Sequence, residues 1–173
     1  MKRSVIVAIA VAAAGVAVRA QTTSPYIAET KQNYGFIKSN LTRMADKMPE
    51  EHYSFKPAGE IRSFGEAIAH VADAQARSCS LVLGTTRAVD AAAKKSKPEL
   101  VAALKESFAI CDEAFDGMTD ATASQMVRLG QSTRERSKLG LLIGVTSHSN
   151  EQYGYMAVYM RLKGIVPPSS EPQ

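Results

Sequence analysis

Apolar residues recur every three or four positions in four stretches of the chain, and this spacing predicts four amphipathic helices. The stretches are residues 24–48, 63–83, 96–115 and 137–163. Pro49 ends the first stretch, while Gly84 and Gly164 follow the second and the fourth, as expected of residues that stop a helix. Four helices of this length predict an all-α four-helix bundle.

The second and third helices carry a capping box at their N-termini. Ser63 precedes Glu66, and Ser96 precedes Glu99, each at the spacing that lets both side chains satisfy free backbone N–H groups. Residues 120–136 are polar and poorly periodic, so we expect a long crossover with a short strand or turn near residues 126–129. The long connections leave room for crossovers in the bundle.

Cys79 and Cys111 are the two cysteines of the chain. Each falls late in its helix, so a disulfide is favoured if the second and third helices run parallel, because the two residues then lie at similar heights. An up-down arrangement fits this pairing less well. The alternative is a pair of reduced, buried cysteines that pack as small apolar side chains.

Residues 1–20 have the pattern of a secretory signal peptide. Lys2 and Arg3 precede an apolar run, and the segment closes at Ala20 with small residues that suit cleavage. We therefore expect a periplasmic protein with a helical domain at residues 24–166 and a flexible tail at 167–173. The run is too short to span a bilayer, so no membrane attachment is expected after cleavage.

The signal segment also accounts for most of the net positive charge. It holds three of the 21 basic residues and none of the 17 acidic ones, which leaves a net charge of +1 on the remainder. Nucleic-acid binding proteins need clustered Lys and Arg to displace counterions from phosphates. The composition therefore argues against a nucleic-acid partner.

Two polar residues interrupt the predicted apolar stripe of the fourth helix, which consists of Leu141, Val145, Tyr155, Tyr159 and Leu162. His148 and Gln152 lie four residues apart and so share one face, the spacing at which two helical side chains can bind one metal ion. His70, on a small-residue face of the second helix, is a candidate third ligand. The alternative is that these are hydrogen-bonded core residues, because Gln is a poor ligand for transition metals.

Two segments resemble the DinB/YfiT-like superfamily. They are residues 63–75, SFGEAIAHVADAQ, and residues 148–168, HSNEQYGYMAVYMRLKGIVPP, with the stretch from Phe55 to Pro57 also similar. The resemblance, which extends over residues 26–168, implies a four-helix bundle of up-down-down-up topology with a parallel second and third helix. It also implies a divalent metal, such as nickel or zinc, held by one His of the second helix and a His-x-x-x-His pair of the fourth.

His70 and His148 match that metal pattern, but Gln152 stands where the resemblance implies a second His. Three interpretations stay open. Gln152 coordinates weakly through its amide oxygen, Glu151 substitutes for it, or the three polar residues form a metal-free network or small-molecule pocket.

The functional hypotheses follow from these interpretations. The first is an exported DinB-like protein with a weak or degenerate metal site and no assigned activity. The second, which draws on activities of some members of the similar superfamily, is a metal-dependent enzyme of the S-transferase or hydrolase type. The third is a non-catalytic bundle that binds a small ligand, a partner or a second copy as a homodimer. Export weighs against a low-molecular-weight thiol cosubstrate, because such thiols are concentrated inside cells.

Overall fold

The computed structural model describes residues 24–172, so the predicted signal peptide lies outside the described residues. The elements in chain order are α1 (Pro25–Lys47), η1 (Glu50–His52), α2 (Phe64–Leu83), η2 (Ala91–Ala93), α3 (Lys97–Asp116), α4 (Asp120–Ala123), β1 (Met126–Arg128), β2 (Glu135–Ser137), α5 (Lys138–Leu162) and η3 (Pro168–Ser170). Every helix of this described part is too short or too polar to span a bilayer.

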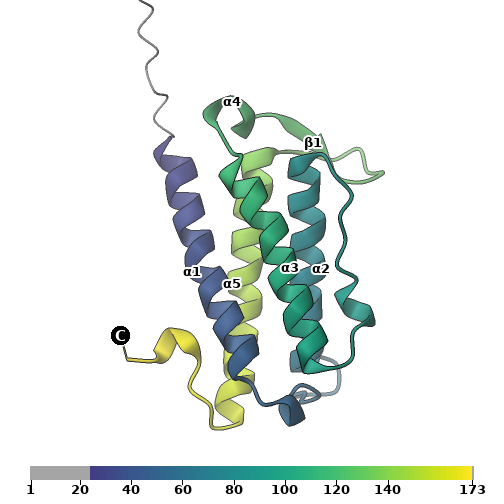
Figure 1. Ribbon diagram of the computed structural model, residues 1–173, viewed down its shortest axis with the longest axis vertical. Coiled ribbons are helices and arrows are strands. Elements are labelled where there is room, and N and C mark those ends of the chain that lie inside the picture. The colour runs from purple at the N-terminus through teal and green to yellow at the C-terminus, as the bar shows by residue number, and fades with distance from the viewer. Residues whose placement is uncertain (1–23, 173) are drawn as a thin grey trace, which may run out of the picture.

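The four long helices pack as a bundle in which α2 and α3 run parallel to each other (Figure 1). Helix α1 runs along the bundle, α2 and α3 both run back against it, and α5 returns in the direction of α1. The connection between α2 and α3 travels the length of the bundle, as a parallel pair requires. This confirms the predicted all-α, up-down-down-up fold.

A disulfide joins the parallel helices. Cys79 of α2 and Cys111 of α3 are bonded, with their Cα atoms 5.0 Å apart. Because α2 and α3 start at the same end, the late position of each cysteine brings the two to the same height. The predicted pairing is therefore confirmed in the structure.

The apolar stripe of α1 is buried as predicted, from Ile27 through Leu41 to Met48. The predicted stripe of α5 is partly wrong, because Tyr155 and Leu162 are more than half exposed. The inward face of α5 is formed instead by Leu142, Val145, Ser149, Met156 and Met160. His148 consequently lies at the border of the core and faces sideways toward α2.

The crossover before α5 contains the predicted strand. β1 pairs with β2 in an antiparallel hairpin in which Val127 lies opposite Arg136. Ser137 then caps α5 by accepting a hydrogen bond from the Gly140 N–H group. The hairpin and α4 cover one end of the bundle, away from the groove described below (Figure 1).

Residues 167–172 dock on the bundle, in place of the free tail expected from their prolines. Pro168 is buried, and the Tyr153 hydroxyl donates to Ser169 Oγ. Glu171 pairs with Arg43 and Lys47 of α1. These contacts link distant parts of the chain, so local composition could not reveal them.

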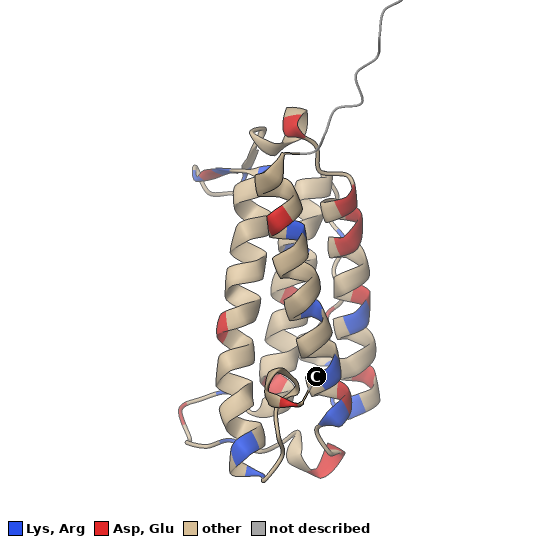
Figure 2. Cartoon of the chain, turned by 90° about the vertical axis from the view of Figure 1, so that its left-hand side faces the viewer, with Lys and Arg blue, Asp and Glu red and all other residues tan. Residues whose placement is uncertain are grey.

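Charges on the α1 side of the bundle are of both signs (Figure 2). Most of the charged residues of α1 form ion pairs. Lys31 and Lys38 of α1 form ion pairs with Asp116 and Asp112 of α3. The mixture agrees with the nearly neutral charge of the chain beyond residue 20.

Candidate functional site

The structure brings His70 of α2 and His148 of α5 together. Their Nε2 atoms lie 3.1 Å apart, and the two rings meet at 74° with their centroids 4.9 Å apart. Both side chains are partly exposed, at the line where the two helices meet. The sequence pattern had placed them on different helices, and the packing of α2 on α5 makes them a pair.

The environment keeps both imidazoles neutral near neutral pH. Burial is the main cause that lowers the pKa of His70, and the neighbouring charges of Arg62 and Arg77 lower it further. Burial also lowers the pKa of His148, while the carboxylate of Glu151 opposes that shift. Two neutral rings at this distance share one hydrogen bond, in which one Nε2–H donates and the other Nε2 accepts.

The outer nitrogen atoms of the pair have no protein partner. Within residues 24–172, neither Nδ1 atom forms a hydrogen bond to another residue. Glu66 lies one turn before His70, but it accepts from the backbone N–H of Ser63 at 2.6 Å in the predicted capping box. A metal-binding His usually donates its second N–H to a carboxylate or carbonyl, so these rings are held less firmly than is common in metal sites.

Gln152 lies one turn after His148 on α5, and only 7% of its surface is exposed. Glu151 is exposed and accepts a hydrogen bond from the Tyr155 hydroxyl at 3.0 Å, so it is engaged away from the histidines. In the described part of the chain, no three His, Cys, Asp or Glu residues are grouped to hold a metal. Of the three ligands named from the sequence, the amide oxygen of Gln152 is therefore the remaining candidate beside the two imidazoles.

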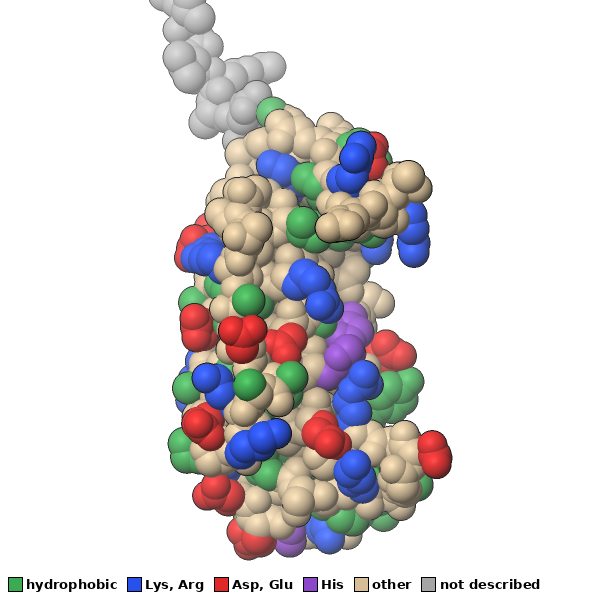
Figure 3. Space-filling view, turned by 90° about the vertical axis from the view of Figure 1, so that its right-hand side faces the viewer, with side chains coloured by type: hydrophobic (Ala, Val, Ile, Leu, Met, Phe, Trp, Pro, Cys, Tyr) green, Lys and Arg blue, Asp and Glu red, His purple; other side chains and the backbone are tan. Residues whose placement is uncertain are grey.

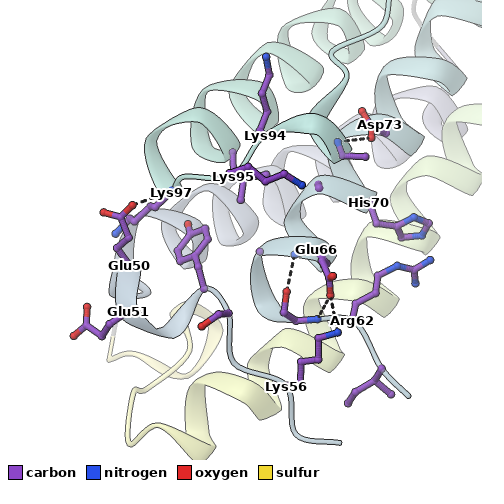
Figure 4. Close-up of a pocket in the computed structure, with 18 of the residues that line it drawn as sticks. Glu50, Glu51, Lys56, Arg62, Glu66, His70, Asp73, Lys94, Lys95 and Lys97 are labelled. Atoms are coloured by element: carbon purple, nitrogen blue, oxygen red, sulfur yellow. Dashed lines mark hydrogen bonds and ion pairs between the residues drawn. The ribbon is translucent and has the colours of Figure 1, made fainter. Parts of the chain in front are cut away.

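His70 also lines a groove of about 950 Å³ that runs beside α2. The loop before α2 and the segment around η2 form its other walls, and Figure 4 shows the charged residues along it. Asp73 fixes the η2 wall, because its two carboxylate oxygens accept hydrogen bonds from the N–H groups of Ala91 and Ala92 at 2.7 and 3.0 Å. The groove gives the histidine pair an open, solvent-accessible side.

Sequence reasoning missed two residues of this region, Arg62 and Arg77. Both line the groove with His70. Arg77 follows His70 by seven residues, which is two helical turns, and this spacing was a signal available in the sequence. Arg62 precedes the helix, and its backbone carbonyl accepts a hydrogen bond from the Tyr159 hydroxyl of α5 at 3.1 Å. That contact could not be read from local sequence.

The model of the DinB superfamily matches residues 37–156, which is well over half of the chain. The chain belongs to the DinB superfamily. Among curated proteins, no relative matches it.

Two solved structures of DinB-like proteins share the fold. One, from Bacillus cereus ATCC 10987, has a TM-score of 0.71 and 19% identity, and the match covers 82% of this chain and 95% of that one. The other, a DinB-like protein (YjoA) from Bacillus subtilis, has a TM-score of 0.65 and 16% identity, over 84% of this chain and 96% of that one. At such identities the DinB likeness establishes the fold, so the function must be argued from this chain's own residues.

Proposed function

We propose that this DinB-superfamily protein is exported and binds a divalent transition metal weakly between α2 and α5, through His70, His148 and the amide oxygen of Gln152. The observation that carries the proposal is the 3.1 Å separation of the two Nε2 atoms. Two imidazoles bound to one metal at about 2.0–2.1 Å place their nitrogens roughly 2.9–3.4 Å apart. The separation of the two nitrogens therefore suits one ion, and binding requires the donating Nε2 to lose its proton and both rings to turn their lone pairs toward the ion.

The protonation state of the pair supports the same conclusion. Metal ligands must be deprotonated, and burial already lowers the pKa of both imidazoles. Nickel and zinc are ions that imidazole ligands suit, whereas an amide oxygen adds little affinity for them. We therefore expect a weaker site than one with three imidazoles.

A site with so few protein ligands leaves coordination positions open toward the groove. Open positions are typical of catalytic rather than structural zinc, because a water or a substrate can occupy them. With a metal bound, the ion would supply Lewis-acid activation of such a ligand. Hydrolase and transferase reactions are the classes to screen.

Export is supported by two features outside the site. Residues 1–20 have the pattern of a signal peptide, and Cys79 is disulfide-bonded to Cys111. Disulfides persist mainly in oxidising compartments such as the periplasm.

A metal-free pocket for a small ligand is the second candidate. The positive charges of Arg62 and Arg77 act on both histidines, and they oppose a cation as much as a proton. In this case the two imidazoles stay hydrogen-bonded to each other, and the site binds its ligand without a metal.

The test is metal content, measured by plasma mass spectrometry on protein purified from the periplasm without chelators. We expect bound nickel or zinc in the wild type, loss in His148→Ala, and affinity raised about tenfold or more in Gln152→His, because a second imidazole replaces the amide. His52→Ala is the matched control, since His52 lies in η1 and should leave metal content unchanged.

Two results would decide against the proposal. Metal content that survives in His148→Ala would place the ion elsewhere. An empty wild type that gains metal only in Gln152→His would mean that the native site is metal-free, which favours the second candidate.

A further inference from the structure

Two basic residues beside the histidine pair, Arg62 and Arg77, line the same groove as His70. Elsewhere, basic side chains are commonly paired, as Arg87 is with Glu113 through two hydrogen bonds of 2.8 Å. In the described part of the chain, the guanidinium groups of Arg62 and Arg77 have neither an ion pair nor a hydrogen bond. They are charged donors without an acceptor.

The acidic residues that lie between the two arginines on α2 are already engaged. Glu66 accepts from Ser63 and also pairs with Lys56 at 3.4 Å. Asp73 accepts from two backbone N–H groups at the start of η2. Neither carboxylate forms an ion pair with Arg62 or Arg77, so both guanidinium groups keep their hydrogen-bond donors for a ligand.

The two arginines bracket the histidine pair along α2. Arg77 follows His70 by seven residues, about 10 Å along the helix axis. Arg62 lies before the first turn, and its side chain extends toward His70 (Figure 4). In Figure 3, histidine side chains reach the surface with basic side chains above and below them and acidic side chains to either side. The charges of both arginines act on both imidazoles, so the two guanidinium groups flank the pair.

We propose that the open face of the His70–His148 pair binds a small molecule through a compact oxyanion, a carboxylate or phosphate group, held by Arg62 and Arg77. The planar guanidinium matches both oxyanions with two parallel hydrogen bonds, which an ammonium group cannot do. This inference rests on the proposed function, because it places the ligand beside the same histidines. It adds that the ligand of that site is an anion. The groove provides room for the remainder of the molecule.

The first test uses metal-free protein with inorganic phosphate and, separately, acetate as probes. Calorimetry measures affinity, and NMR of the imidazole signals reports whether the probe binds beside His70 and His148. We expect saturable shifts of both signals and a loss of at least tenfold in affinity in Arg62→Gln and in Arg77→Gln. The tighter probe distinguishes phosphate from carboxylate recognition.

Lys95→Gln is the matched control. It removes the same charge from the same groove, and Figure 4 shows Lys95 across the groove from His70. We expect less than a twofold change in affinity. All three positions are exposed, so each variant should keep the wild-type thermal unfolding curve. Equal losses in all three variants, or no saturable imidazole shift, would overturn the inference.

A second titration, with nickel added first, separates this inference from the proposed function. If nickel does not bind and phosphate still depends on both arginines, the metal proposal fails and the oxyanion site stands. If nickel binds through His148 and the affinity for phosphate is unchanged in Arg62→Gln and Arg77→Gln, the proposed oxyanion site is wrong and the metal proposal stands.

Discussion

Two polar clusters link α2 with α5, and they differ in whether their hydrogen bonds are complete. In the buried cluster, Gln75 donates to Ser107 of α3 and accepts from Ser149 of α5, both at 3.2 Å, and all three side chains are at most 2% exposed. In the other cluster, the side chains of His70 and His148 are partly exposed, and among the described residues each hydrogen-bonds to the other alone. His148 and Ser149 are consecutive, so one turn of α5 serves both clusters.

The difference separates a structural role from a binding role. A buried polar group needs all its partners, and the Gln75 amide finds them within the protein, which leaves nothing to bind a ligand. Within residues 24–172, the Nδ1 atoms of the histidines have no hydrogen-bonding partner and the guanidinium groups of Arg62 and Arg77 are unpaired. Substitutions in the buried cluster should therefore lower the stability of the fold without affecting ligand binding. Substitutions of the histidine pair should weaken ligand binding with little effect on stability.

The largest expected effect comes from the disulfide, which lies one turn beyond the buried cluster on both helices. Cys79 follows Gln75 by four residues, and Cys111 follows Ser107 by four. Replacing both cysteines by Ala should lower the free energy of unfolding by about 3–4 kcal/mol, because a loop of this length is no longer closed in the unfolded chain. Denaturant titration measures the loss.

The same double variant tests whether the structural role of the buried cluster is independent of ligand binding at the histidine pair. Where it is folded, its affinity for metal and phosphate should equal that of the wild type. A parallel loss of binding would show that the disulfide positions the histidine pair, and the two clusters would then not be independent.

Gln75→Leu should have the next largest effect, a loss of about 1–3 kcal/mol. The substitution fills the space but leaves the buried Ser149 hydroxyl without an acceptor. Replacing Ser107 and Ser149 by Ala in the same chain should recover part of the loss, since no polar group is then left unpaired. A Gln75→Leu variant as stable as the wild type would contradict the structural role of the cluster.

The helix boundaries could be predicted from sequence because they depend on local chemistry. Ser63 and Gly84 begin and end α2 as expected, the former through its capping box and the latter in the left-handed conformation at φ 70°. The orientation of α5 could not be predicted as well, because apolar residues lie on several of its sides. Its stripe was therefore drawn through Tyr155, which is 54% exposed.

The candidate site could be predicted only in part. The residues His70, His148 and Gln152 were identified, but a sequence does not say how close two helices approach or at what height. Arg62 enters the groove through a loop whose position depends on Tyr159 of α5. Such contacts between distant residues decide the charge of the site, and no local pattern records them.

His148→Ala should have a smaller effect on stability than either change to the buried elements. The side chain is partly exposed, and its one hydrogen-bonding partner, His70, can turn to water. We expect the free energy of unfolding of the metal-free protein to change by less than about 1 kcal/mol, as is usual away from the core. A loss as large as that in Gln75→Leu would mean that the histidine pair is structural.

The smallest expected effect is a dependence of stability on pH below about 6.5, the ordinary pKa of the histidines. The charged groups around the pair are Arg62, Arg77, Asp73 and Glu151. Burial lowers the pKa of both rings in the folded protein, so between the lowered values and 6.5 the unfolded chain binds more protons. Stability therefore falls as the pH falls through this window and is restored above it.

Because both rings are partly exposed, solvent screens their charges and the effect stays small. Denaturant titrations at several pH values should show the fall in the wild type and not in a His70→Asn/His148→Asn double variant, whose amides do not titrate. Metal binding must weaken over the same window, since protonated imidazoles cannot bind an ion. The affinity for acetate, which stays ionised over this window whereas phosphate gains a proton, should rise with the added positive charge. Opposite pH trends for the two ligands would therefore show that the histidines contact both, and parallel trends would contradict a shared site.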